Sequence, residues 1–473
     1  MMPAALFFWA LPDCGYTAAR VPRQGGGVMT GWRTSLSMYG DRRVLAILLL
    51  GFSSGLPLAL TLSTLSAWLS VSGISRASIG TFALVGTPYA LKFLWSPLID
   101  RLPPPVPLGQ RRGWGIVIQL ALMAAVFALG TCDPVRNPAM VAALAVVVAF
   151  LSASQDIVID AYRVEALTPE QQGPGAGMTQ AGYRLAMLTS GAGALFLAGH
   201  FGWFTAYATM AALLCVGVLV FACSPEPQRK PSAQTIERER RAAEYLAHRP
   251  HLQGMRAAVL AWLYGAVICP FADFMTHRNW LAILIFVIGY KLGEAMAGMM
   301  AMPLYVSLGF SLDEIAWVSK LFGFAATVLG GLLGGWLVVR LGAVPSLMLC
   351  GVLQSLGNLF YVLQAAAGHR VEVLALCVFA ENLTGGMAGA AMVAYLSGLC
   401  NVAYTATQYA LLSSLSAVGR TLFASVGGVG AELLGWTNFF IGTTLVTIPA
   451  LVLLAWVARR DRLALVDDRN LKY

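Results

Sequence analysis

The stretch 44–66, VLAILLLGFSSGLPLALTLSTLS, contains no charged residue. A run of about 20 apolar residues crosses a bilayer only as a helix, because hydrocarbon offers its backbone no other hydrogen-bond partner. The chain as a whole is 58% hydrophobic and 11% charged. It predicts an all-α polytopic membrane protein with twelve transmembrane spans: 44–66, 78–99, 114–131, 139–160, 176–199, 203–223, 280–302, 315–339, 345–366, 372–397, 408–431 and 437–458.

The first span has a counterpart later in the chain. Leu45-Ala-Ile-Leu48 recurs as Leu281-Ala-Ile-Leu284, and Gly73 matches Gly309 at the same offset of 236 residues. Two pseudo-symmetric six-helix halves joined by a long loop are typical of the major facilitator fold, in which the substrate binds between the halves near mid-membrane. The expected domains are a cytoplasmic leader 1–43, an N-terminal half 44–223, a cytoplasmic loop 224–279 with an interfacial helix at 257–271, a C-terminal half 280–458 and a cytoplasmic tail 459–473.

The net charge of +9 is unevenly distributed. If the N-terminus is cytoplasmic, the loops on the other side hold only Arg76, Arg136 and Arg370, and all other loop Lys and Arg residues lie inside. Positive residues mark the cytoplasmic face, so both termini are expected there. The net positive charge therefore reflects membrane topology. We expect the protein to lie in a lipid bilayer and not to bind nucleic acid.

Motifs of enzymes and metal proteins are missing from the sequence. The eight cysteines form no CxxC pair, and there is no HExxH, P-loop, nucleophile elbow or histidine cluster. We therefore expect no enzymatic activity, no cofactor, no metal and no disulfide.

A short charged motif joins the second and third spans. Asp100-Arg101 is followed by Arg111-Arg112-Gly113, which approximates the facilitator pattern G-x-L-x-D-R-x-G-R-R. Topology alone explains the arginines but not Asp100, which can accept hydrogen bonds from basic residues at cytoplasmic helix ends. We interpret Asp100, Arg101, Arg111 and Arg112 as gating residues that hold the halves in one state.

Charges inside a span are costly and mark function or structural pairing. The acids are Glu294 and Glu381, with Asp156, Asp160 and Glu432 nearer helix ends, and the cations are Lys92, Arg184, Lys291, Lys320 and Arg420. This excess of cations predicts an anionic substrate bound from both halves. The alternative, that one or two cations pair structurally with Asp156 or Asp160, stays open.

Protons, if they drive transport, need carboxylates, because no predicted span contains a histidine. Lys291 and Glu294 are three apart on one helix, so they form either a self-neutralising pair or a proton site tuned by the lysine. Glu381 is either a proton site or the static partner of Arg420 or Lys320. We take Glu381, Glu294 and Asp156 as the proton-coupling candidates.

Aromatic residues near these charges can stack on sugar rings, although Trp and Tyr at span ends also serve as interface anchors. The candidates are Trp68, Tyr89, Trp95, Tyr183 and Tyr290.

Several stretches resemble the AmpG muropeptide permeases, a branch of the major facilitator superfamily. They run in order along the chain: Gly51–Thr61, Leu84–Arg101, Arg111-Arg-Gly-Trp114, Ser152–Tyr162, Gly182–Met187, Tyr290-Lys-Leu-Gly293, Glu381–Met387 and Ala406–Arg420. The next residue after Gly293 departs from the family pattern, because Glu294 stands where Asp is expected. With the polar residues of these stretches, the substrate-binding candidates are Lys92, Arg184, Tyr183, Tyr89, Lys291, Lys320, Arg420, Gln155, Asn382 and Gln408.

The resemblance implies proton-driven import of 1,6-anhydromuropeptides across the bacterial inner membrane by alternating access. It further implies roles in peptidoglycan recycling and β-lactamase induction, and we expect a monomer. A related permease for another large anionic solute, such as acetyl-CoA, is the alternative within transporters. A membrane sensor without transport is the alternative from another class.

Overall fold

The computed structural model describes residues 37–74, 82–228, 240, 268–277, 279–424 and 427–470, and the regular structure in these residues is helical. Most of the leader 1–43, the loop 224–279 and its interfacial helix at 257–271 lie outside the described residues. The side chains of Lys320 and Arg420 lie outside them as well.

The N-terminal half begins after a short segment, η2 (Met38–Gly40), and the Asp41 side chain caps its first helix by accepting the Arg43 N–H. Its spans contain 3-10 or π segments at several points. In order, the elements are α2 (Arg42–Ala59), η3 (Leu60–Thr64), α3 (Leu65–Val71), η4 (Ala83–Gly86), α5 (Thr87–Leu91), η5 (Lys92–Leu94), α6 (Ser96–Arg101), α7 (Gln110–Gly130), α8 (Pro138–Ala166), η6 (Pro169–Gln171), α9 (Gln172–Leu188), η7 (Thr189–Gly193), α10 (Ala194–Phe201), α11 (Trp203–Leu213) and α12 (Cys215–Cys223).

The C-terminal half repeats this order, and its backbone preserves the repeat. Gly73 and Gly309, 236 residues apart, follow the first and seventh spans with positive φ angles of 79° and 87°, which glycine adopts without strain. The elements are α15 (Cys269–Met275), α16 (Trp280–Gly289), α17 (Leu292–Ser307), α18 (Leu312–Val318), η9 (Ser319–Gly323), α19 (Phe324–Leu341), α20 (Ala343–Gly357), α21 (Leu359–Ala367), α22 (Val371–Leu399), η10 (Val402–Tyr404), α23 (Thr405–Ala424), α24 (Gly427–Val446) and α25 (Ile448–Asn470).

Nine helical segments of the described chain are long and apolar enough to cross a membrane. The predicted spans 78–99, 176–199 and 408–431 are largely helical too but are not among the nine. Their helices face the opposite half: α9 packs on α19 and α22, and α5 and α6 pack on α23. A helix shielded from lipid by protein tolerates polar residues and glycine, which explains their lower hydropathy.

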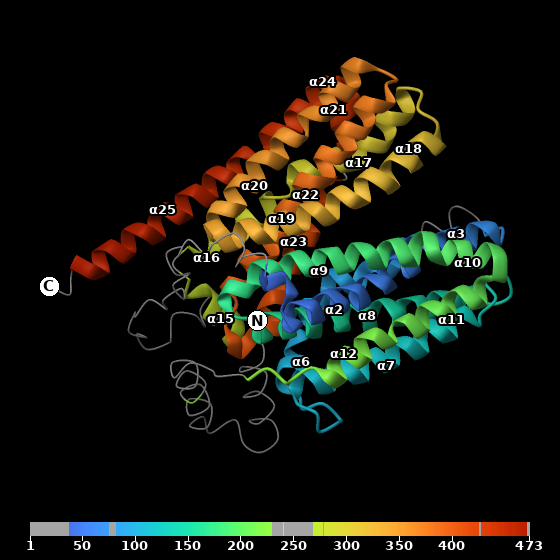
Figure 1. Ribbon diagram of the computed structural model, residues 1–473, viewed down its shortest axis with the longest axis horizontal. Helices are drawn as coiled ribbons and strands as arrows, with labels where there is room; N and C mark the ends of the chain where they lie inside the picture. The colour runs from blue at the N-terminus through green and yellow to red at the C-terminus, as the bar shows by residue number, and fades with distance from the viewer. Residues whose placement is uncertain are drawn as a thin grey trace, which may run out of the picture.

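The two halves form separate bundles that converge at one end and diverge at the other (Figure 1). We call the end with α6, α15 and the start of α23 the closed end. The end with α3, α10, α18 and α24 is the splayed end. α2 begins and α25 ends on the side of the closed end (Figure 1).

Glycines allow the halves to approach each other. A Cβ atom at Gly173 of α9 would lie 2.5 Å from the Gly335 carbonyl oxygen of α19, and one at Gly177 would lie 2.7 Å from the Gly331 oxygen. In each helix the two glycines are four apart, so they share a face, and small residues at this spacing let backbones pack closely in a membrane. We call these four residues the glycine seam.

We expect Gly177→Ala to destabilise the folded protein by about 1–3 kcal/mol, because the new methyl group would collide with α19 backbone. Gly298→Ala is the matched control, since a Cβ at this α17 position meets nothing within 4 Å. The control should be neutral or more stable by about 0.5–1 kcal/mol. Thermal unfolding of the purified protein in detergent measures both, and equal effects of the two substitutions would contradict the close seam.

Candidate functional site

The seventh span is interrupted where its charges lie. Between α16 and α17, Lys291 has the non-helical angles φ −102° and ψ 11°, and Glu294 lies in the first turn of α17, where the helix dipole favours an anion. Lys291 Nζ lies 2.7 Å from Glu294 Oε2, so the predicted i, i+3 pair is present. Glu294 also accepts a hydrogen bond from Gln354 Nε2 on α20. The side chains of Lys291 and Glu294 are 18% and 26% exposed, so this ion pair is open to small solutes.

The N-terminal half contributes Gln180 and Arg184, which share a face of α9. A Cβ at Gly389 of α22 would lie 3.3 Å from Gln180 Nε2 and 3.8 Å from Lys291 Nζ, so both side chains reach the same point. Arg184 Nε is buried and has no hydrogen-bond partner among the described residues. A polar ligand bound between the halves would satisfy this donor.

Glu381 of α22 completes this group of residues between the halves. Its carboxylate interacts electrostatically with Glu294, Arg184 and Lys291. Asn382 donates to Glu381 Oε2 over 2.8 Å and accepts from Thr327 Oγ1 of α19 over 2.9 Å, which fixes the orientation of the carboxylate. We call Gln180, Arg184, Lys291, Glu294 and Glu381 the inter-half cluster; its described charges are two cations and two carboxylates.

A second group of charges lies within the N-terminal half. Asp156 of α8 accepts a 2.5 Å hydrogen bond from Ser54 of α2 and interacts electrostatically with Lys92. Lys92 Nζ lies 3.8 Å from Asp160 Oδ2, one helical turn further along α8. Tyr89, a turn before Lys92, interacts with Asp156 as well. Lys92, Tyr89 and Asp156 are thus brought together, and the contact between Lys92 and Asp160 is the structural pairing that the sequence left open as an alternative.

Asp100 joins the two halves at the closed end. Its carboxylate accepts hydrogen bonds from the Thr407 N–H and Oγ1, both 2.8 Å, and from the Ala406 N–H at 3.4 Å, all in the first turn of α23. A helix N-terminus carries free N–H groups and partial positive charge, so a carboxylate is a strong partner for it. The basic partner expected for Asp100 is Arg111 of the same half, and bonds across the halves come from backbone N–H groups and a hydroxyl.

Arg111 fixes Asp100 from within the N-terminal half. It is fully buried, lies 2.7 Å from Asp100 Oδ1 and makes hydrogen bonds of 2.7–3.2 Å to both oxygens of Glu165. Glu165 was not predicted. It follows the fourth span, and the positive-inside rule used there concerns Lys and Arg and gives no signal for an acidic residue. The planar guanidinium suits a carboxylate on each side.

The other two predicted gating residues differ in their contacts. The Arg101 guanidinium lies 5.5 Å from the ring centre of Tyr404, which precedes α23 in the other half. Arg112 donates to the carbonyls of Phe221 and Ala222, so its described bonds stay within the N-terminal half. Arg101 is therefore placed at the contact between halves, and Arg112 beside it.

Three predicted polar and aromatic residues are held in structural bonds. Gln408 donates to Pro270 O and Asp273 and accepts from the Asn401 N–H, away from the inter-half cluster. Gln155 is buried and donates to Ser53 of α2. The Tyr290 hydroxyl donates to Leu347 O within the C-terminal core. Tyr183 adjoins Arg184 on α9 and is half-buried.

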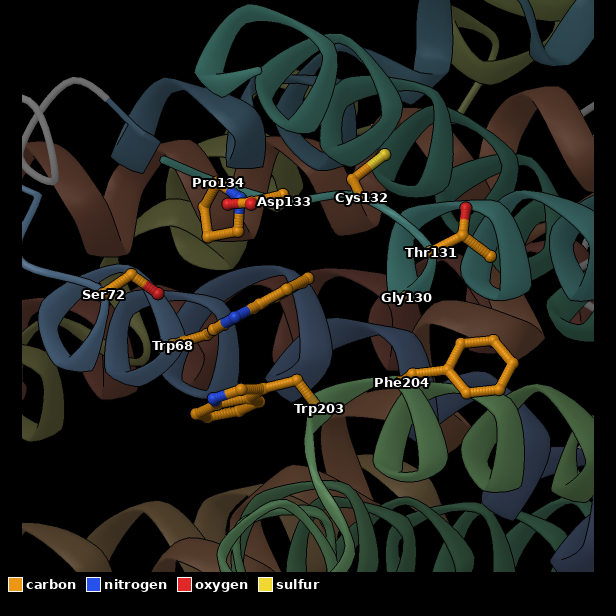
Figure 2. Close-up of a pocket in the computed structure, with 9 residues that line it drawn as sticks. All are labelled: Trp68, Ser72, Gly130, Thr131, Cys132, Asp133, Pro134, Trp203 and Phe204. Atoms are coloured by element: carbon orange, nitrogen blue, oxygen red, sulfur yellow. The ribbon is translucent and has the colours of Figure 1, made fainter. Parts of the chain in front are cut away.

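Trp68 and Asp133 line a cavity of about 490 Å³ at the splayed end of the N-terminal half (Figure 2). It is only 4% exposed and stacks on Trp203 with ring centres 5.5 Å apart. Trp68 therefore supports the core of its own half and does not join the inter-half cluster.

The chain matches the family model of the Major Facilitator Superfamily over residues 47–306 and 280–471. It is 40% identical to the Anhydromuropeptide permease of Escherichia coli (strain K12) over 422 residues, which cover 89% of this chain and 80% of that protein. It is 34% identical to the Putative transporter AmpG 4 of Rickettsia felis over 427 residues, with coverages of 89% and 98%.

Solved structures share the fold at low sequence identity. The human organic anion transporter MFSD10 (TETRAN) aligns with a TM-score of 0.56 at 14% identity, over 90% of this chain and 100% of that one. The proton:xylose symporter XylE aligns with a TM-score of 0.56 at 10% identity, over 89% and 95%.

We expect Asp100→Asn to lower the stability of the purified protein by about 1.5–3 kcal/mol, the typical contribution of hydrogen bonds to a charged group. Asp41→Asn is the matched control, because the Asp41 side chain also caps a helix. Its capping hydrogen bond is exposed and lies within its own half. Thermal unfolding reports both. If the two variants unfold alike, Asp100 does not hold the halves together.

Proposed function

Because the chain belongs to the major facilitator superfamily and to the AmpG permease family within it, we propose that it imports 1,6-anhydromuropeptides across the bacterial inner membrane. These are disaccharides of N-acetylglucosamine and anhydro-N-acetylmuramic acid, with or without a stem peptide. Import is proton-coupled and works by alternating access, and it serves peptidoglycan recycling and β-lactamase induction. The protein acts as a monomeric symporter.

The observation that supports this proposal most is the inter-half cluster. A substrate released by rocking of the two halves must contact both, and the cluster combines Gln180 and Arg184 of α9 with Lys291, Glu294 and Glu381 of the other half. The stem peptide and its carboxylates suit Arg184 and Lys291, since a guanidinium and an ammonium both donate to carboxylate oxygens. The sugar hydroxyls suit Gln180 and Asn382, and the rings of Tyr183 and Tyr89 offer stacking faces. Lys320 and Arg420 remain further candidates of the same set.

Charge balance accounts for the coupling to protons. The described cluster holds two cations and two carboxylates, so it is neutral while both acids are ionised. Protonation of Glu381 leaves one positive charge, which attracts an anionic substrate into a site of low dielectric constant. Proton and substrate then favour each other's binding. Asp156 is the proton site of the N-terminal half in the same scheme, and Glu294 is the alternative acid.

The closed end is assigned to the cytoplasm. Arg101, Arg111 and Arg340 lie toward this end of their helices, whereas Arg136 and Arg370 lie on the loops at the splayed end. Positive residues favour the cytoplasmic side, so both termini are cytoplasmic and the structure represents an outward-facing state. Asp100, Arg101, Arg111 and Arg112 then close the cytoplasmic gate.

Uptake of labelled anhydromuropeptide into proteoliposomes tests the proposed function. We expect accumulation above equilibrium when a proton gradient is imposed, and equilibration only when an uncoupler is added. Equilibration under both conditions would refute proton coupling while retaining the substrate. A folded preparation that takes up no anhydromuropeptide would contradict the proposed substrate. If acetyl-CoA then competes with the uptake of another labelled anion, the alternative function, a permease for nucleotide-bearing solutes, is favoured.

Glu381→Gln is expected to abolish gradient-driven accumulation while it leaves exchange of internal for external substrate, because the carboxamide keeps the shape but cannot carry the proton. Glu372→Gln is the matched control: it lies in the exposed first turn of the same helix. A pH profile of uptake compares the two variants. A wild-type profile for Glu381→Gln would remove Glu381 from the coupling scheme.

A further inference from the structure

A further contact between the halves at the closed end comes from a buried arginine. Arg163 of α8 is 0% exposed and donates from Nη1 to Ser397 Oγ of α22 over 2.8 Å. Its guanidinium carbon lies 5.1 Å from the ring centre of Tyr409 on α23. An arginine of one half is thus inserted between two helices of the other.

This arginine is poorly satisfied compared with Arg111. Its Nη2 lies 3.5 Å from Asp160 Oδ1, beyond normal hydrogen-bond distance, and its Nε has no partner among the described residues. A buried cation depends strongly on its counter-charge. The contact between Arg163 and the C-terminal half is therefore sensitive to anything that changes the charge of Asp160.

Asp160 is shared between two cations, and a row of alternating charges leads from it to Asp156. Asp156, Asp160 and Arg163 lie on one face of α8 at i, i+4 and i+7, and Lys92 interacts with both aspartates from η5. The row thus reads Asp156, Lys92, Asp160, Arg163, with a net charge of zero when all four are ionised.

The C-terminal half lies against this row. Tyr409 interacts electrostatically with Asp156, Asp160 and Arg163. Cys400, just after α22, interacts with Asp160, Arg163 and Asp100. Together with Tyr89 of α5, which interacts with Asp156, Tyr409 and Cys400 are titratable groups that face the row.

We propose that Arg163 is a positioning residue that couples the charge of Asp156 to closure of the cytoplasmic end. When Asp156 is neutral, Lys92 pairs fully with Asp160, Arg163 loses its counter-charge, and its contact with Ser397 is released. The net charge of the row then rises to +1, and Lys92 and Arg163 repel each other across a medium of low dielectric constant. The inference rests on the proposed alternating-access transport and adds the link between proton site and gate.

The native Cys400 provides a probe for the test, because its partly buried thiol lies at the end of α22, three residues beyond Ser397. The rate of Cys400 alkylation is measured by mass spectrometry on the purified full-length protein in nanodiscs, at one pH and without substrate. Asp156→Asn imitates the neutral acid and is expected to raise this rate about fivefold or more, as for a coupling between two sites. In the Arg163→Gln background the same substitution should add nothing.

Further variants keep the test decisive. Asp160→Asn interrupts the row at another point, so in this background Asp156→Asn should no longer raise the rate of Cys400 alkylation. This variant provides the test even if Arg163→Gln does not fold. Tyr162→Phe is the control: this neighbour on α8 bonds to Pro225 O within its own half, so its removal should preserve the full response. The proposal is overturned if Asp156→Asn leaves Cys400 unchanged, or if it has the same effect in the Arg163→Gln or Asp160→Asn background.

The assay separates this inference from the proposed function. It contains neither muropeptide nor a proton gradient, so a failure of uptake in proteoliposomes does not alter its outcome. Normal proton-driven uptake together with an unresponsive Cys400 would instead leave the transport proposal intact and reject the role of Arg163.

Discussion

The bonds between the Asp100 carboxylate and the first turn of α23 are the contact on which the arrangement of the halves depends. A carboxylate on free N–H groups is favourable, and burial beside Arg111 strengthens it because little water competes. This contact lies at the closed end, where the two halves meet. In the proposed transport cycle it opens without unfolding either half, since Arg111 also binds Glu165 and α23 has its own helical bonds. A transporter needs this combination of strength and reversibility at its gate.

The glycine seam complements that contact. Gly173 and Gly177 let α9 lie against α19 with backbone atoms in contact, so along this seam the halves meet without large side chains between them. The same closeness positions Gln180 and Arg184, one and two turns further along α9, beside Lys291 and Glu381. The packing of two helices thus determines where the charges of the two halves meet. Along α9, the small residues thus lie at the closed end and the polar residues lie at the proposed site.

Much of this was predictable from local patterns. Span lengths and the repeat at an offset of 236 residues predicted the fold, and the i, i+3 spacing predicted the Lys291–Glu294 pair. Asp100 was identified because topology did not explain it, but its partner Thr407 is 307 residues away, and only the docking of the halves reveals it. Gln180 was missed because a glutamine in an interface helix is unremarkable alone; its place one turn from Arg184 was the available signal. Gln408, taken from a family-like stretch, is engaged instead in bonds near α15.

In the proposed transport cycle the two halves rock about the inter-half cluster while Asp100 closes and opens one end. Distances between spin labels at positions 136 and 370, on the splayed ends of the two halves, test it most directly by pulsed electron resonance in nanodiscs. We expect a broad distribution of long distances for the protein alone and a shift to shorter distances when anhydromuropeptide is added at acidic pH. An unchanged distance distribution, in a preparation that transports the substrate, would contradict it.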